Sequence, residues 1–159
     1  MKKKDKDDGV KVVCRNKRAR HDYELGERFE AGMELSGTEV KSLRMGKANL
    51  TDAYARVVDG EVWLMNLHIS PYPFARYDNH DPDRKRRLLM HKKEIRKLFG
   101  KTQERGQALI PLSIYFKDGW AKVDLALGKG KHSYDKRQTL KRRDAEREME
   151  RAIRRRNMD

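Results

Sequence analysis

The chain has 159 residues and a formal net charge of +14. Charged residues are so frequent that only about 105 to 110 central positions can build one modest core. Its single cysteine, Cys14, excludes an intrachain disulfide and a cysteine metal cluster, and we expect an incidental exposed thiol. No apolar run approaches the ~20 residues that cross a bilayer, and no secretory signal is visible, so we expect a cytoplasmic protein.

Positive charge is concentrated at the two ends of the chain. Residues 1–20 have a net charge of +6, residues 21–128 of +2 and residues 129–159 of +6. A nearly neutral body with two basic arms is typical of a protein that binds a polyanion. The expected polyanion is nucleic acid.

The first expected elements of the body are short. Strands are predicted around Tyr23 to Leu25 and around Met33 to Leu35. Ser36 and Glu39 have the spacing of a capping box, which predicts a short helix that ends at Gly46.

Residues 54–67 predict a β-hairpin. Two strand-like runs rich in Val, Trp and Leu flank Asp59-Gly60, a pair that is suited to a two-residue type I′ turn.

A long irregular loop with three prolines is expected over residues 70–82. It carries the aromatic residues Tyr72, Phe74 and Tyr77, which can stack on unpaired bases. We expect them instead to fold back over the end of the sheet.

Four consecutive basic residues, Arg84 to Arg87, precede the apolar run Leu88 to Met90. Such a strip can hold phosphates and pack against a nucleotide face, which we favour over a solvated charge run. Residues 91–99 then predict a second short helix that ends at Gly100.

A second strand pair is predicted around Lys117-Asp118-Gly119, from Leu109 to Phe116 and from Trp120 to Leu127. Pro111 cannot donate to a ladder, so it places its strand at an edge or at a bend. Alternation along the later strand points Lys122 away from the core. Antiparallel strands with few short helices predict a small closed β-barrel, because closure removes exposed sheet edges.

The C-terminal tail has too few large apolar residues to form a core, and Gly128 to Lys131 before it are expected to form a flexible basic hinge. Like charges four residues apart oppose helix formation by a few tenths of a kcal/mol each. We therefore expect a tail that is disordered when free and helical when bound, the alternative being a permanently docked helix. Arginines recur at this spacing at Arg143, Arg147, Arg151 and Arg155.

Two histidines, His21 and His80, have an aspartate next to them in the sequence, as acid–base chemistry would require. No His-x-x-x-His pair or second cysteine accompanies them, so we expect no metal, no cofactor and no catalytic residue. We therefore expect a protein that is not an enzyme, with an RNA-processing enzyme that uses His21 or His80 as an alternative.

A series of short motifs occurs in a distinctive order, led by Gly37 to Arg44 and followed at once by Gly46 to Asn49. Further motifs are residues 16–23, 30–32, 68–72, 79–82, 88–92 and 134–137. Together they resemble the small protein B family, the bacterial partner of transfer-messenger RNA. The resemblance runs from about residue 15 to the end of the chain.

The resemblance implies an oligonucleotide-binding-type closed antiparallel β-barrel over residues 15–130, with a basic arm over 1–14 and a basic tail over 131–159. It implies a monomer that binds the tRNA-like domain of transfer-messenger RNA and accompanies it to stalled ribosomes in trans-translation. There the tail becomes helical in the empty message channel. The partners are then transfer-messenger RNA and the ribosome, with no membrane, and the alternative is a permanent ribosomal structural protein.

The resemblance also assigns site residues. The RNA-binding positions are Asn16, Lys17, His21, Glu30, Leu89 and Lys122, although Leu89 can equally belong to the core. The positions that meet the ribosomal decoding centre and message channel are Gly130, Tyr134, Asp135, Lys136 and Arg137, continued by the arginine row of the tail. Some relatives have His in place of Tyr134, so no charged imidazole acts there, while stacking on a base remains available.

Overall fold

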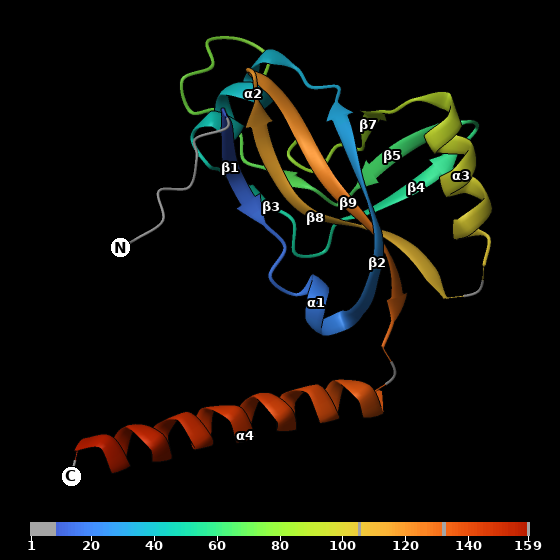
Figure 1. Ribbon diagram of the computed structural model, residues 1–159. Coiled ribbons are helices and arrows are strands. Elements are labelled where there is room, and N and C mark those ends of the chain that lie inside the picture. Colours follow the sequence, from blue (N-terminus) through green and yellow to red (C-terminus); the bar gives the residue numbers. More distant parts are fainter. Residues whose placement is uncertain (1–8, 105, 132, 159) are drawn as a thin grey trace.

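The structure of the protein, a computed structural model, describes residues 9–104, 106–131 and 133–158 (Figure 1). Side chains are described except at 133–139 and 158, and residues 1–8 of the expected N-terminal arm lie outside the described part. The helices are α1 (Ala19–Asp22), α2 (Gly37–Arg44), α3 (Lys92–Thr102) and α4 (Ser133–Met158). The strands are β1 (Val10–Arg15), β2 (Tyr23–Met33), β3 (Ala48–Asn49), β4 (Tyr54–Val58), β5 (Glu61–Met65), β6 (His68–Ile69), β7 (Arg86–Leu89), β8 (Gln107–Lys117) and β9 (Trp120–Gly130).

Six strands pair antiparallel in a closed ring. The order is β8-β4-β5-β7-β2-β9, and the ring closes because β9 also pairs with β8. Strand β1 pairs with β8 on the edge opposite to β9. Strands β3 and β6 form a separate two-stranded sheet. The prediction of a mainly β body with short helices is confirmed.

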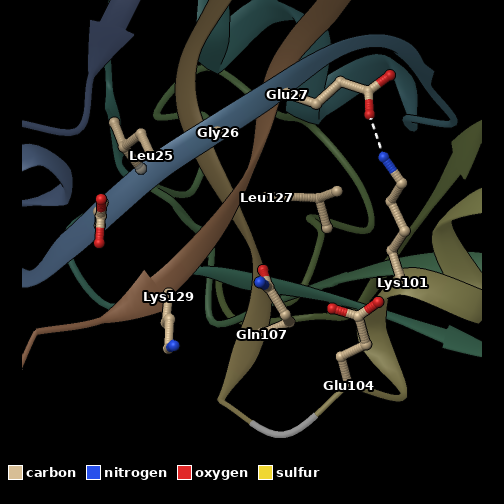
Figure 2. Close-up of a pocket in the computed structure, with 9 residues that line it drawn as sticks. Leu25, Gly26, Glu27, Lys101, Glu104, Gln107, Leu127 and Lys129 are labelled. Carbon is tan, nitrogen blue, oxygen red and sulfur yellow. Dashed lines mark hydrogen bonds and ion pairs between the residues drawn. The ribbon is translucent and has the colours of Figure 1, made fainter.

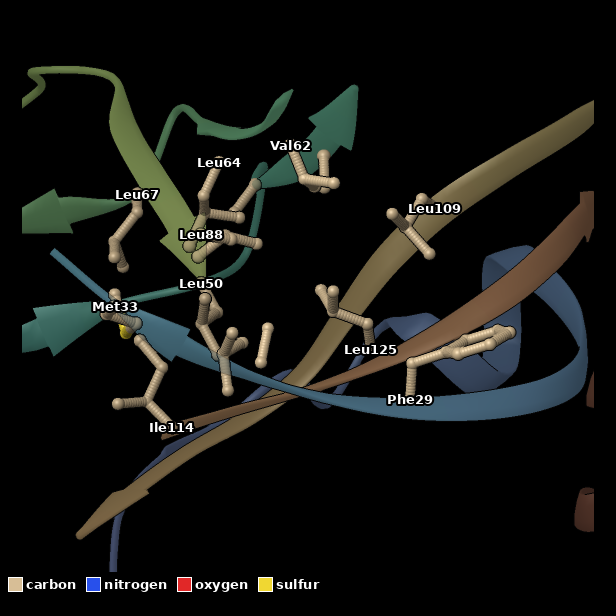
Figure 3. Packing of buried hydrophobic residues seen from close by; sticks show 14 of the residues in the cluster. Phe29, Met33, Leu50, Val62, Leu64, Leu67, Leu88, Leu109, Ile114 and Leu125 are labelled. Atoms are coloured by element: carbon tan, nitrogen blue, oxygen red, sulfur yellow. The ribbon is translucent and has the colours of Figure 1, made fainter. Parts of the chain in front are cut away.

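The ring closes around a core of leucine, isoleucine, valine and phenylalanine side chains. In β5 Val62 and Leu64 are fully buried while their neighbours are only partly covered, as the two-residue period of a strand requires. Figure 3 shows Leu64 beside Leu88 of β7, and Leu125 of β9 belongs to the same buried cluster. The apolar alternation in the sequence therefore sets which face of each strand points inward.

Both predicted hairpins are present. The β4–β5 turn is Asp59-Gly60, with φ angles of 50° and 75°, and the β8–β9 turn is Asp118-Gly119, with φ angles of 52° and 81°. Left-handed backbone at both central residues is the requirement of a type I′ turn. The ladder between β8 and β9 is irregular between Pro111 and Ser113, so Pro111 marks a bend in a central strand.

Helix α2 forms where it was predicted, but the prediction of a capping box at its start is wrong. Ser36 makes no side-chain cap bond, and the carboxylate of Glu39 is instead buried and engaged by two arginines. The C-terminal end follows expectation. Gly46 has a φ of 72°, its N–H bonds to the carbonyl of Leu43, and Lys47 N–H bonds to that of Ser42, as in a Schellman motif.

Several predicted boundaries are wrong because the elements continue beyond the residues that their local sequence signals indicate. The two short strands expected at 23–25 and 33–35 are one strand, β2, and α3 continues through Gly100 to Thr102. The expected hinge at 128–131 is largely strand, since β9 runs to Gly130 and Gly128 is buried.

The sheet also begins earlier than residue 15, since β1 starts at Val10 within the arm that was expected over 1–14. Cys14 is half-buried against the core, which corrects the expected exposed thiol. Burial raises its pKa to about 11, so the thiol stays protonated at neutral pH.

Helix α4 follows the ring as a separate 26-residue element that touches α1 (Figure 1). All its side chains from residue 140 to 157 are exposed, including Leu140, Met149 and Ile153, so this length is not packed on the ring. Within the part of the chain that the structure describes, no helix combines the length and the apolar character that a membrane crossing requires.

Candidate nucleic-acid interface

Three of the predicted RNA-binding residues meet on the outer face of the ring. Strand β2 lies between β7 and β9, so that Gly32 pairs with Leu89 on one side and with Lys122 on the other. Glu30 lies two residues before Gly32 and shares its face. A hollow of about 510 Å³, which we call the β2 hollow, is lined by Glu30, Gly32, Leu89, Met90, His91, Glu94 and Lys122.

Leu89 lies beside Gly32 and lines the β2 hollow. A Cβ atom at Gly32 would lie 3.4 Å from the Cβ of Leu89, an ordinary van der Waals contact. Leu88 is buried in the core, and the next residue, Leu89, is 51% exposed on the opposite face. The alternative that Leu89 belongs to the core is therefore wrong, and its side chain is free to contact a ligand.

Glu30 is held as a carboxylate by its neighbours. The hydroxyl of Tyr115 donates a hydrogen bond to Glu30 Oε2, and Lys117 Nζ lies 3.7 Å from the same oxygen. This hydrogen bond, together with the charges of Lys117 and Lys122, holds the pKa of Glu30 below its usual value. Burial and the bond to Glu30 raise the pKa of Tyr115, so the phenol remains a donor.

The β2 hollow thus combines three kinds of contact. An ionised carboxylate accepts hydrogen bonds only and fits the amino and 2′-hydroxyl donors of RNA. Lys122 offers a cation for phosphate, and Leu89 offers an apolar contact. Sequence reasoning missed Gly32, Tyr115 and Lys117. The last two could have been predicted from the turn at Asp118-Gly119. Its register places Tyr115 opposite Lys122 and Lys117 opposite Trp120.

The early motif lies elsewhere, around α1 at the opposite end of β2 (Figure 1). Asn16 Nδ2 donates to the carbonyl of Pro111 at 3.1 Å, and the Arg18 N–H donates to Asn16 Oδ1 at 3.2 Å. Lys17 is exposed, and His21 Nδ1 lies 2.9 Å from Asp22 Oδ1. Asn16 therefore holds the α1 turn against β8, and the structure does not bring the early motif to the β2 hollow.

The start of the tail is tied to α1. Gly130 pairs with Tyr23 at the end of β9. The backbone N–H of Lys131 donates to the carbonyl of Asp22, and its Nζ donates to the carbonyl of Arg20, both at 3.0 Å. Tyr134, Asp135, Lys136 and Arg137 lie in α4 with side chains outside the described part. The four arginines of the tail, Arg143, Arg147, Arg151 and Arg155, are exposed.

The basic run at 84–87 is not a free phosphate-binding strip, and this interpretation is corrected. Arg86 is completely buried and Arg84 is half-buried, and their Nε atoms donate to Glu39 at 3.0 and 2.7 Å. Arg87 pairs with Glu34 and Glu61, and Lys85 Nζ lies 5.0 Å from the ring centre of Trp63. These cations are engaged within the chain because α2 supplies Glu39, the residue after β2 supplies Glu34, and β5 supplies Glu61 and Trp63.

The loop at 70–82 presents two of its aromatic side chains to solvent. Phe74 is 71% exposed and Tyr77 is 90% exposed, so the expectation that they fold back is wrong for both. The loop is held by Asn79, whose amide bonds the backbone of Tyr72 in both directions, and by His80, which bonds Thr38 and the carbonyl of Ile69. These bonds assign His80 a structural contact.

A second cleft, of about 480 Å³, lies between β2 and the end of α3 (Figure 2). Three glutamates line it, Glu24, Glu27 and Glu104, and Glu27 is paired with Lys97 and Lys101. Lys101 and Lys129 also line it and largely balance the glutamates, so the cleft has no excess of positive charge for phosphate and we do not assign RNA to it. In the described residues no three His, Cys, Asp or Glu side chains come together in a way that could hold a metal ion.

The sequence model of the SmpB protein family matches residues 13–155. The chain belongs to the SmpB family. The SsrA-binding protein of Geobacter metallireducens is 62% identical to this SmpB-family chain over 149 residues, covering 94% of this chain and 97% of that relative. The SsrA-binding protein of Thermobifida fusca is 54% identical over 155 residues, covering 98% of this chain and 97% of that relative.

A solved structure is also similar to this SmpB-family chain. It is described as "tmRNA-SmpB: a journey to the center of the bacterial ribosome". The match has a TM-score of 0.65 and 53% sequence identity, and it covers 79% of this chain and 86% of that chain. The likeness thus extends from sequence to fold.

Proposed function

We propose that this SmpB-family protein is an RNA-binding adaptor that binds the tRNA-like domain of transfer-messenger RNA. It delivers this RNA to stalled ribosomes for trans-translation, which rescues the ribosome and tags the peptide for degradation. The observation that carries the proposal is the meeting of Glu30, Leu89 and Lys122 in the β2 hollow. The SsrA-binding names of the relatives and the tmRNA-SmpB structure support the choice of RNA.

In this proposal the ring is an oligonucleotide-binding-type β-barrel over residues 15–130. The ionised Glu30 accepts hydrogen bonds from the RNA, Lys122 contacts a phosphate, and Leu89 packs on a sugar or base. The early motif of Asn16, Lys17 and His21 provides a second contact beside α1. The protein is a cytoplasmic monomer without cofactor or catalytic residue, and the chemistry of peptide transfer belongs to the ribosome.

The tail over residues 131–159 acts on the ribosome. Gly130, Tyr134, Asp135, Lys136 and Arg137 meet the decoding centre, where Tyr134 can stack on a base. The exposed arginine row then lies along the phosphates of the empty message channel. A helix of 26 residues spans ~39 Å, long enough for such a channel. We propose that the tail is disordered when free and helical when bound, because phosphates remove the repulsion between its arginines.

Sequencing of the RNA that copurifies with the protein from cells tests the proposal. We expect enrichment of transfer-messenger RNA, lost in Lys122→Glu and retained in Arg56→Glu, a matched charge reversal at an exposed position of β4 outside the β2 hollow. Equal recovery of transfer-messenger RNA by both variants would remove the β2 hollow from the binding surface. Recovery at fixed stoichiometry in washed subunits, without transfer-messenger RNA, would instead identify a permanent ribosomal protein.

A further inference from the structure

Trp120 is a large apolar side chain left in solvent beside the β2 hollow. It is the first residue of β9, at the tip of the β8–β9 hairpin, and it is 73% exposed. The other tryptophan, Trp63, is half-buried under the ammonium group of Lys85. Among the described residues Trp120 has no aromatic or cation–π contact, so its ring faces are open.

The hairpin register orients Trp120 with the residues of the β2 hollow. Trp120 and Lys122 are two residues apart on a regular part of β9, so they share a face and lie ~7 Å apart along the strand. Lys117 pairs with Trp120 and also reaches the carboxylate of Glu30. The indole therefore flanks the polar side of the β2 hollow, with lysines on either side.

Two further apolar side chains lie on β1, on the far side of Lys117 from Trp120. Val10 pairs with Lys117 and Val12 pairs with Tyr115, so both valines share this outer face, and each is 40% exposed. The face therefore has apolar groups at its margins, Leu89 on β7 and the valines on β1, with Trp120 at the hairpin tip. Between them lie Glu30, Lys117 and Lys122, which can hydrogen-bond and neutralise phosphates.

We propose that Trp120 forms a base-stacking subsite of this surface, which takes an unpaired nucleobase of the bound RNA. An aromatic ring can stack on a base only where that base is unstacked from its neighbours, as in a loop or a bulge. Lys117 and Lys122 then contact the phosphates on either side of the stacked base. The identity of the RNA rests on the proposed function, whereas the subsite itself rests on the register and exposure of Trp120.

Tryptophan fluorescence tests the subsite directly. The Trp63→Phe variant keeps Trp120 as its only tryptophan, and we expect its emission to be quenched when the RNA of the tRNA-like domain is titrated in. The reciprocal Trp120→Phe variant keeps only Trp63, which lies under Lys85, and its emission should change little. Equal responses from the two variants would overturn the proposal.

Affinity provides the second readout. Trp120→Ala should weaken binding of the same RNA by about fivefold or more, while Trp120→Phe keeps a stacking ring and most of the affinity. Circular dichroism should show both variants folded, since the side chain is exposed.

The outcomes separate this proposal from the proposed function. If the wild-type protein fails to bind the RNA in a mobility-shift assay, the proposed function falls. If the wild-type protein binds the RNA, Trp120→Ala binds it equally well and Trp63→Phe shows no fluorescence response, only the stacking subsite is excluded. A fluorescence response to ribosomal proteins but not to RNA would assign the surface to a protein partner and overturn the subsite.

Discussion

Glu39 is a single residue that organises the basic run before β7. Its side chain is completely buried, and its two oxygens accept hydrogen bonds from Arg84 and Arg86. Burial acts to raise its pKa, but the two arginines overcome this and hold the pKa below its ordinary value of 4.5. Glu39 is therefore ionised at neutral pH and balances the buried charge of Arg86.

Replacement of Glu39 should expose this dependence. Glu39→Gln leaves the guanidinium of Arg86 buried without a counter-ion, so we expect the free energy of unfolding at pH 7 to fall by ~3 to 5 kcal/mol. Urea unfolding followed by circular dichroism measures the loss. Glu34→Gln is the matched control, because Glu34 pairs with Arg87 at the surface and should cost less than ~1 kcal/mol. Equal losses would contradict a special role for the buried pair.

The same pair predicts an acid dependence. The pKa of Glu39 is lower in the folded protein than in the unfolded chain. Its contribution to the free energy of unfolding is therefore complete above the unfolded-state pKa and is lost as the pH falls through the folded-state pKa. The wild-type free energy of unfolding should therefore fall more steeply than that of Glu39→Gln between about pH 5 and pH 3. Parallel curves for the two proteins would exclude the ionised carboxylate as the source.

At the scale of elements, local turn signals were enough to predict the two hairpins but not the longer pairings. Asp-Gly pairs specify their turns through the backbone alone. The prediction divided β2 in two because its middle, around Gly26 and Glu27, is polar. Pairing with β9 on both sides of a register shift between Leu25 and Arg28 makes it one strand. Glu39 was read as a cap, since no local pattern reveals arginines 45 and 47 residues away.

The candidate site shows the same division. Lys122 could be placed on the outer face from alternation alone, and its partner Tyr115 follows from the hairpin register. The neighbours of Glu30 and Leu89 depend on the order of β7, β2 and β9 in the ring, which no local pattern in this sequence specifies. The family resemblance supplied these positions without their geometry.

Two glycines inside elements should respond oppositely to alanine. Gly100 lies in α3 with nothing near an added Cβ, so Gly100→Ala should raise the free energy of unfolding by ~0.5 to 1 kcal/mol. Gly128 lies in β9, where the Cβ would be 3.1 Å from Tyr23 Cβ and 3.3 Å from Ile110 Cγ1. Gly128→Ala should cost ~1 to 3 kcal/mol. Thermal and urea unfolding check both, and a shift of the same sign in both variants would contradict the packing argument.

Helix α4 should exchange its amide hydrogens quickly in the free protein. Its side chains over 140–157 are exposed, so packing does not stabilise this length, and its arginines repel one another. Measured by hydrogen exchange, the amides of residues 140–155 should be little protected in the free protein and strongly protected when the protein is bound to the ribosome. Protection in the free protein that does not change with salt would contradict a tail that folds on binding.

At the scale of the whole molecule, charge and task are divided between ring and tail. Residues 132–159 carry ten lysines and arginines against six acids, whereas the β2 hollow lies on a nearly neutral body. Binding of the tRNA-like domain should weaken with salt by ~0.7 to 0.9 in log affinity per log salt for each phosphate contacted. Truncation after Lys131 should leave this affinity and slope largely intact but abolish peptide tagging. Unimpaired tagging by the truncated protein would remove the role of the tail.

The eleven residues of β2 connect two anchored ends. Its first residue pairs with Gly130, beside the bonds that tie Lys131 to α1, and Glu30 and Gly32 near its other end line the β2 hollow. The strand is continuous between these ends, with one register shift between Leu25 and Arg28, so β2 sets their spacing. The distance between the RNA on the ring and the point where the tail departs is consequently built into one secondary-structure element, at most roughly 23 Å from Tyr23 to Glu30.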